Sequence, residues 1–245
     1  MKAKQAHIMS VIQPPSVKSI NDIKLTLHTT FDIPKVKGNN DITGGIVSPN
    51  GKMIFVNYYN RSISILNEDG TLDNEITCLS GNAFDVTCLD DTTVAVSTRN
   101  GIVIIHIGST KTERRIETSK PCFGITYHNG VLLWCEYQRG IQMMKLSDDI
   151  VTTLVKQINL PHFSYLTTCG DKIYQTNRDT STVTCYTTKG EMLWEFKDVS
   201  VLKDPWGVTV DNNSNVYVTS VSSNEIVVIE PDGREGRQLI SSEDD

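Results

Sequence analysis

The stretch that decides the fold is PWGVTVDNNSNVYVTSVSSNEIVVIEPDG, residues 205–233. Apolar runs at 206–210, 216–219 and 226–229 are separated by polar turns at 211–215 and 220–225. Pro231-Asp232-Gly233 is a tight-turn signal, because proline presets φ and glycine accepts a positive φ. A fourth strand can follow at 238–240. The stretch therefore predicts a four-stranded antiparallel meander.

The same unit recurs upstream about every 40 residues. Thr209 in GVTV has counterparts at Thr167, Thr126, Thr87 and Val47. A period of this length with four strands per unit is the signature of a β-propeller. Segments such as IVII at 102–105 are apolar at every position, as expected for sheets buried on both faces. We therefore predict an all-β propeller of four-stranded antiparallel blades at 42–79, 84–117, 123–159, 164–196 and from 206 onward.

The two ends of the chain do not fit complete blades. Residues 1–21 hold lysines, no acid before residue 22 and a Pro-Pro pair, which predicts a flexible tail or linker. Residues 23–33 alternate apolar and polar side chains and predict a strand without a blade of its own. We expect one propeller domain over 22–245: five complete blades plus this orphan N-terminal strand, an incomplete six-bladed ring. A five-bladed ring closed by an extra strand is the alternative.

Composition limits the functional classes. The net charge of −6, from 23 basic and 29 acidic residues, gives no global footprint for nucleic acid or an anionic membrane. No apolar run approaches the roughly 18 residues of a membrane span, and no secretory signal is recognisable. The six cysteines show neither CxxC nor zinc spacing, so we expect reduced thiols in a cytoplasmic protein: Cys78, Cys88, Cys122, Cys135, Cys169 and Cys185.

Two stretches, NYYNRSISILNEDG (57–70) and SSNEIVVIEPDG (222–233), resemble NHL repeats in their turn, isoleucine-containing strand and closing Asp-Gly. The strands in AFDVTCLDDTTVAVS (83–97), CFGITYHNGVLLW (122–134) and PWGVTVDNNSNVYV (205–218) resemble the NHL propellers of tripartite-motif (TRIM) proteins, especially divergent invertebrate forms. This resemblance implies a module for protein interaction or RNA binding, plausibly the substrate-recognition part of a ubiquitin ligase. The zinc-binding RING and B-box of that family need Cys/His pairs that these residues lack, so ligase catalysis would not reside in this chain.

Four turns between the second and third strands of a blade contain an arginine. Equivalent turns of a propeller share one face, and the connections between blades open on the same face. There we expect a partner-binding site made of Arg61, Arg99, Arg139, Arg178, Lys120, Lys203, Phe84, Phe123 and Trp206. Arginines interleaved with aromatic rings can pair with carboxylates or phosphates and stack on rings. The alternative is that the arginines bridge to acids in adjacent blades, such as Glu136 and Asp179, and that the aromatic side chains fill the wedge between blades.

No motif predicts catalysis. The five histidines lack ligand spacing, and no nucleophile elbow, P-loop or dinucleotide fingerprint occurs. We expect no enzyme activity, no cofactor and no bound metal. The main alternative to a protein or peptide partner is RNA, whereas a small molecule is not the expected ligand. A second alternative is a metal-dependent lactonase-like hydrolase with calcium-type ligands at Asp85, Asn177 and Asp204.

Overall fold

The computed structural model describes residues 5–12, 19–33, 41–77, 79 and 81–240. Apart from one turn of 3-10 helix, η1 (Ile20–Asp22), every regular element in the described residues is a strand. Five four-stranded antiparallel sheets and one two-stranded sheet form. The predicted all-β propeller is confirmed. No helix among the described residues is long and apolar enough to cross a membrane.

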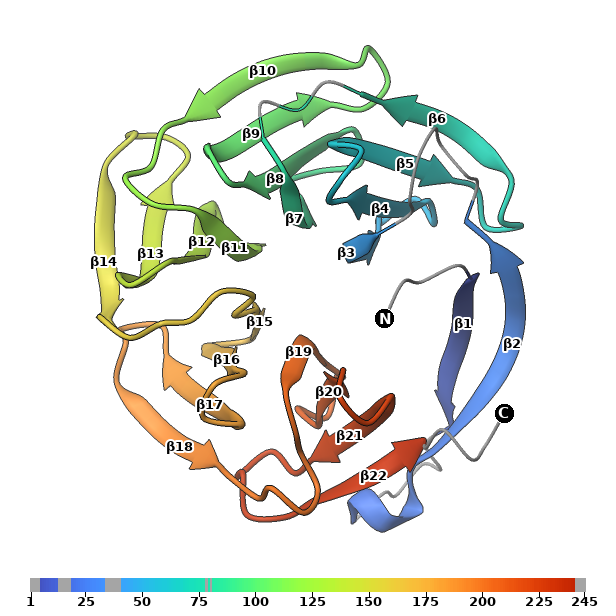
Figure 1. Cartoon of the computed structure of the whole chain (residues 1–245), viewed down its shortest axis with the longest axis vertical. Coiled ribbons are helices and arrows are strands. Elements are labelled where there is room, and N and C mark those ends of the chain that lie inside the picture. Colours follow the sequence, from blue (N-terminus) through green and yellow to red (C-terminus); the bar gives the residue numbers. More distant parts are fainter. Residues whose placement is uncertain (1–4, 13–18, 34–40, 78, 80, 241–245) are drawn as a thin grey trace. The chain divides into compact units, whose positions relative to one another are not determined.

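The chain forms two compact units. Unit 1 consists of Met1–Ala6 and Phe31–His162, and unit 2 of His7–Thr30 and Phe163–Asp245. Unit 1 contains three blades, each built from four consecutive strands. Figure 1 shows β3, β7 and β11 at the inner ends of these blades and β6, β10 and β14 at the outer ends.

The blades of unit 1 follow the predicted boundaries closely. The first comprises β3 (Ile42–Val47), β4 (Met53–Asn57), β5 (Ser62–Leu66) and β6 (Leu72–Ile76). The second comprises β7 (Ala83–Cys88), β8 (Thr93–Thr98), β9 (Gly101–His106) and β10 (Lys111–Ile116). The third comprises β11 (Cys122–His128), β12 (Val131–Glu136), β13 (Gly140–Lys145) and β14 (Val151–Lys156).

Unit 2 contains two blades of the same kind. One comprises β15 (Leu166–Cys169), β16 (Lys172–Asn177), β17 (Thr182–Thr187) and β18 (Met192–Phe196). The other comprises β19 (Pro205–Val210), β20 (Val216–Ser220), β21 (Glu225–Ile229) and β22 (Gly236–Ile240). The meander predicted from 205–233 is therefore present with all four strands.

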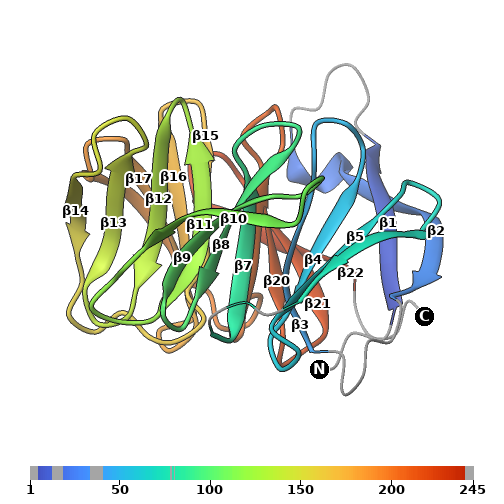
Figure 2. The ribbon, with the colours of Figure 1, turned by 90° about the horizontal axis from the view of Figure 1, so that it is seen from above.

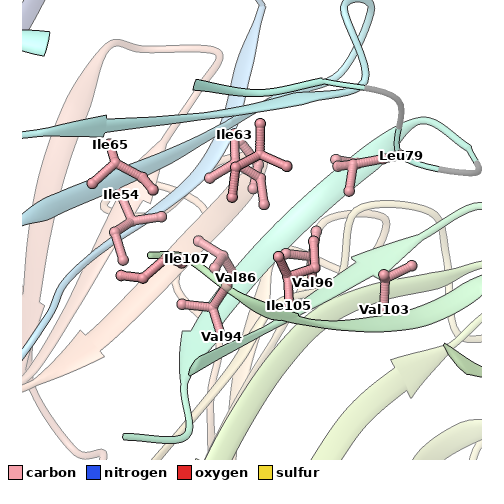
Figure 3. Close-up of a cluster of buried hydrophobic side chains, with 13 residues drawn as sticks. Ile54, Ile63, Ile65, Leu79, Val86, Val94, Val96, Val103, Ile105 and Ile107 are labelled. Carbon is pink, nitrogen blue, oxygen red and sulfur yellow. The ribbon is translucent and has the colours of Figure 1, made fainter. Parts of the chain in front are cut away.

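Strands that are apolar at every position are buried on both faces. In the second blade, Val94, Val96, Val103 and Ile105 pack against the first blade, in the cluster drawn in Figure 3. The intervening residues of the same strands belong to a different cluster, formed with the third blade: Ala95, Ile102 and Ile104. The period-two alternation of β-strand side chains thus supplies two cores from one sheet.

Hydrogen bonds that involve threonine hydroxyls tie neighbouring blades together. The hydroxyl of Thr43 donates to the carbonyl of Ala83 over 3.0 Å, and the N–H of Tyr127 donates to the hydroxyl of Thr87 over 3.2 Å. Each pair is 40 residues apart. In unit 2, the hydroxyl of Thr176 donates to the carbonyl of Trp206 over 2.8 Å. Threonine is therefore placed where a buried hydroxyl can satisfy backbone groups of the next sheet.

The N-terminal strand is present and has a partner. The predicted strand at 23–33 is β2 (Lys24–Asp32), which pairs with β1 (Gln5–Ile12) in the two-stranded sheet. The segment 1–21 predicted as a flexible tail contains β1 and the start of η1, so that segment contains regular structure. Within unit 2, Arg237 of β22 donates to the carbonyls of Ile20 and Ile23. How the ring closes depends on how the two units meet, and stays a prediction.

The connections of unit 1 fall at two ends of its blades. In an antiparallel meander, the first and third turns lie at one end, and the second turn lies at the other end together with the connection to the next blade. Figure 2 shows the strands from above, with the turns gathered at their ends. The end with the second turns carries the predicted site residues of this unit, and we call it the arginine face.

Candidate functional site

Three of the four predicted arginines lie on the arginine face of unit 1. Arg61 is in the β4–β5 turn, Arg99 in the β8–β9 turn and Arg139 in the β12–β13 turn. Hydrogen bonds connect the first two turns: Asn82 donates its side-chain N–H to the carbonyl of Tyr58 over 3.0 Å, and its own carbonyl accepts from the N–H of Arg99 over 3.0 Å. Lys120 lies in the connection between β10 and β11 on the same face.

A continuous row of rings crosses this face, and we call it the aromatic strip. Its centroid distances are 5.0 Å for Tyr59–Tyr58, 5.5 Å for Tyr58–Phe84 and 4.6 Å for Phe84–Phe123. Phe123 then contacts Tyr137 at 6.4 Å and His162 at 5.3 Å, and the last two rings stack at 4.0 Å with 29° between their planes. Most of these contacts have the edge-to-face geometry that aromatic pairs prefer. The strip joins the turns that carry Arg61 and Arg139.

The aromatic strip contains buried phenylalanine rings and more exposed tyrosine and histidine rings. Phe84 and Phe123 are only 4% and 1% exposed, so they fill the space between blades, as the alternative prediction held. Tyr59 is 58% exposed, His162 is also exposed, and Tyr58 and Tyr137 are half-buried. A ligand on this face would therefore meet tyrosine and histidine rings, which two rigid phenylalanines support from below.

Arg139 is held by an internal acid. Its guanidinium donates to the carboxylate of Glu136 over 3.1 Å and to the hydroxyl of Ser119 over 3.0 Å. The Glu136 side chain is fully buried and also accepts from the Ser119 hydroxyl and from the N–H of Lys120. An arginine does pair with Glu136, but the pair lies within one blade and not between adjacent blades as expected. Glu136 fixes both the β12–β13 turn and the loop that carries Lys120.

Arg61, Arg99 and Lys120 are exposed and form no ion pair with any described residue. Arg61 also adopts a left-handed backbone, with φ of +51°. Its equivalent in the last blade, Asn224, has φ of +56° and is a residue type that tolerates this conformation better. These three cations are therefore the part of the predicted site that is available to a ligand.

The predicted site residues of unit 2 form a separate cluster. The guanidinium of Arg178 donates to Asp204 over 2.8 Å, and lies 6.0 Å and 5.9 Å from the ring centroids of Phe163 and Trp206. The second carboxylate oxygen of Asp204 accepts from Ser222 over 2.9 Å. Arg178 pairs with Asp204 and not with Asp179 as expected. The cluster locks the β16–β17 turn to the connection before β19, beside the exposed Lys203.

The residues considered as calcium ligands are occupied by internal hydrogen bonds. The Asp85 carboxylate accepts from the N–H groups of Val86 at 2.9 Å and Ile125 at 3.0 Å. Its burial raises the pKa of the carboxyl to about 7. Asn177 accepts from two N–H groups of its own turn, and Asp204 is engaged as described above. In the part of the chain that the structure describes, no group of three or more His, Cys, Asp or Glu side chains could hold a metal ion.

Sequence reasoning missed four of the six rings of the aromatic strip. Tyr58 and Tyr137 each follow directly after the second strand of a blade, and this recurrence was the available signal. His162 gave no signal, because it lies in the connection that follows β14 and its contacts depend on the fold. Asp204 was considered only as a metal ligand, although its partner is Arg178.

Comparisons with known proteins agree on the architecture. No family model matches the chain, and no curated protein matches it. Among solved structures, a nidogen/laminin complex contains a chain with 16% identity and a TM-score of 0.70, over 86% of this chain and 86% of that chain. The likeness is one of fold.

Two further matches are enzymes by description. Virginiamycin B lyase from Staphylococcus aureus has 23% identity and a TM-score of 0.63, over 80% of this chain and 69% of that chain. A streptogramin B lyase has 17% identity and a TM-score of 0.65, over 84% and 71% of the two chains. At these identities, the shared feature is the propeller, and function must come from the residues of the site.

Proposed function

We propose that this chain is a non-enzymatic interaction module that binds a protein or peptide on the arginine face of unit 1. The observation that carries the proposal is the aromatic strip from Tyr59 to His162, to which all three blades of unit 1 contribute rings. Tyrosine and arginine are the residues that most often provide binding energy at protein interfaces. Rigid blades carry short turns here, the usual division between scaffold and recognition surface.

Two further observations support a protein partner. One similar fold occurs in a structure described as a nidogen/laminin complex, which is an assembly of two proteins. The resemblance of 57–70 and 222–233 to NHL repeats favours the same reading. On that resemblance, the module would select substrates for a TRIM-type ubiquitin ligase whose catalytic RING lies outside these residues.

The test is selection of a displayed random-peptide library on the whole chain. Recovered peptides should lose binding to a Tyr59→Ala/His162→Ala variant, which removes two exposed rings without opening the core. The matched control is Ile150→Ala/Met192→Ala, at two side chains that are 63% and 61% exposed and lie outside the strip. The proposal would be overturned if no peptides were recovered, or if the recovered peptides bound the wild type, the strip variant and the control variant equally.

A further inference from the structure

Charge is segregated between the two ends of the blades in unit 1. The first and third turns of its blades, at the end opposite the arginine face, hold six acids and one base: Glu68, Asp69, Asp90, Asp91, Asp148, Asp149 and Lys52. The described residues of the arginine face outside the strands hold four bases and two acids: Arg61, Arg99, Lys120, Arg139, Asp41 and Glu117. The net charges are therefore −5 and +2.

The acids at the opposite end have local roles. Asp69 accepts from the N–H and hydroxyl of Thr71, and Asp90 accepts from those of Thr92. Asp149 pairs with Arg114. These carboxylates stabilise tight turns, as Asx residues commonly do. Part of the negative net charge of the chain therefore comes from carboxylates that stabilise turns at the opposite end of the blades. It does not describe the charge of the arginine face.

The cations of the arginine face are mostly uncommitted. Arg139 is neutralised by buried Glu136, whereas Arg61, Arg99 and Lys120 have no ion-pair partner among the described residues. Arginine is suited to planar, two-point pairing with a carboxylate. Arg61 lies two residues from Tyr59, so this one turn carries both an exposed cation and an exposed aromatic ring.

The number of available cations on the arginine face fits a short acidic peptide better than a nucleic acid. Nucleic-acid binding commonly neutralises about six to ten phosphates, and three available cations beside two acids fall short of that. The most buried rings, Phe84 and Phe123, are closed to base stacking. A short peptide with two or three carboxylates matches the available cations.

We propose that the arginine face takes an acidic segment of a protein chain. Its carboxylates pair with Arg61 and Arg99, and an apolar or aromatic side chain of the segment packs on Tyr58 and Tyr59. This inference rests on the proposed function, because it names the chemistry of the partner at the same face. It also explains how a chain of net charge −6 recruits an acidic partner.

The experiment uses the peptides recovered from the library and a charge-reversal pair. Arg61→Glu/Arg99→Glu should weaken their binding roughly tenfold or more, since each reversal places a like charge opposite a carboxylate. Lys111→Glu/Lys145→Glu makes the same change in net charge at exposed residues outside the arginine face, and should leave affinity within about twofold. Recovered peptides should be enriched in Asp and Glu, and raising the salt concentration should weaken binding.

The outcomes separate this inference from the proposed function. Strip-dependent peptides that are neutral or basic, and that tolerate Arg61→Glu/Arg99→Glu, would overturn the acidic segment and leave the interaction module intact. Failure to recover strip-dependent peptides would overturn the module itself. A uridine-rich RNA oligonucleotide that binds the wild-type chain and loses binding in the same pair, with no peptide doing so, would overturn both in favour of an RNA reader.

Discussion

The glycine that begins the third strand of a blade adopts a backbone conformation that other residues disfavour. Gly140 starts β13 with φ of +102°, and a Cβ there would overlap the carbonyl oxygen of Val155 on the outer strand. Gly130 has φ of +81° and nothing within 4 Å of such a Cβ. We expect Gly140→Ala to lower the free energy of unfolding by more than about 2 kcal/mol and Gly130→Ala by roughly 1 kcal/mol.

Chemical denaturation of both glycine variants measures this difference. Because both substitutions force alanine to a positive φ, the difference between them reports the steric contacts with the backbone of Val155 and Gln157. Equal losses of stability would show that the outer strand moves aside freely.

Asp85 makes the stability of unit 1 depend on pH. Burial raises the pKa of this carboxyl from 3.8 to about 7, although two N–H groups favour its charged form. The folded protein therefore keeps a proton that the unfolded chain releases, so stability falls as the pH rises from about 4 to 7 and then levels off. The contribution is at most about 4 kcal/mol, at 1.36 kcal/mol per pKa unit.

Thermal or urea unfolding between pH 4 and 8 tests this pH dependence. Asp85→Asn should remove the loss of stability between about pH 4 and 7 that the wild type shows, even if the substitution lowers stability at every pH. Asp91→Asn, at an exposed acid of the next turn, should retain it. A wild-type profile parallel to that of Asp85→Asn would contradict the assignment.

An ion pair within one turn can be inferred from sequence spacing, whereas a pair between segments depends on the fold; the bridges expected here were to acids in adjacent blades. Glu136 and Arg139 are three residues apart, so the strand end and its turn bring them together. Asp204 is 26 residues from Arg178 and reaches it only because one blade packs beside the next. Asp179, the nearer acid in sequence, follows Arg178 directly and lies on the exposed side of the turn.

At the scale of elements, the strands of the blades were predictable because burial on both faces leaves uninterrupted apolar runs between Gly- and Asx-containing turns. The strand β1 was missed because it pairs with β2 in a two-stranded sheet and does not belong to any of the repeats. Only two of the six rings of the aromatic strip were predicted, for a similar reason. Phe84 and Phe123 occupy a repeated strand position, whereas Tyr58 and Tyr137 lie in turns, and their shared position directly after the second strand holds an aromatic residue in only two of the five blades.

The outer strand β14 differs from the other outer strands of unit 1. Residues 150–155 (IVTTLV) carry no charge, and Ile150 and Val151 are 63% and 41% exposed, whereas β10 (KTERRI) is rich in charge. Uncharged edge strands invite pairing with other chains. We expect Thr152→Lys to reduce light scattering during refolding, because a lysine on the edge opposes a second strand.

The control for this edge is Thr112→Lys on β10, also exposed, where charge is already present and scattering should not change. Refolding at several protein concentrations separates association from slow folding. Equal scattering for all three proteins would mean that β14 is protected by its twist or by its register shift near Leu154.

On the scale of the whole molecule, the cores of neighbouring blades are linked through shared sheets. The second blade contributes one side to a cluster with the first blade and the other side to a cluster with the third. Cys88 packs on the first cluster and Cys122 belongs to the second. Burial raises the pKa of both thiols, of Cys88 to about 11, so neither forms much reactive thiolate at neutral pH in the folded protein.

These two cysteines therefore report whether unit 1 unfolds as a single cooperative body. The chain would be pulse-labelled with a thiol reagent at pH 7.4 across a urea gradient, and each cysteine peptide quantified by mass spectrometry. We expect Cys88 and Cys122 to become reactive with the same midpoint, because neither cluster survives once the sheet of the second blade is lost. Midpoints separated by more than the measurement error would show that each pair of blades opens on its own, as in arrays whose repeats are only weakly coupled.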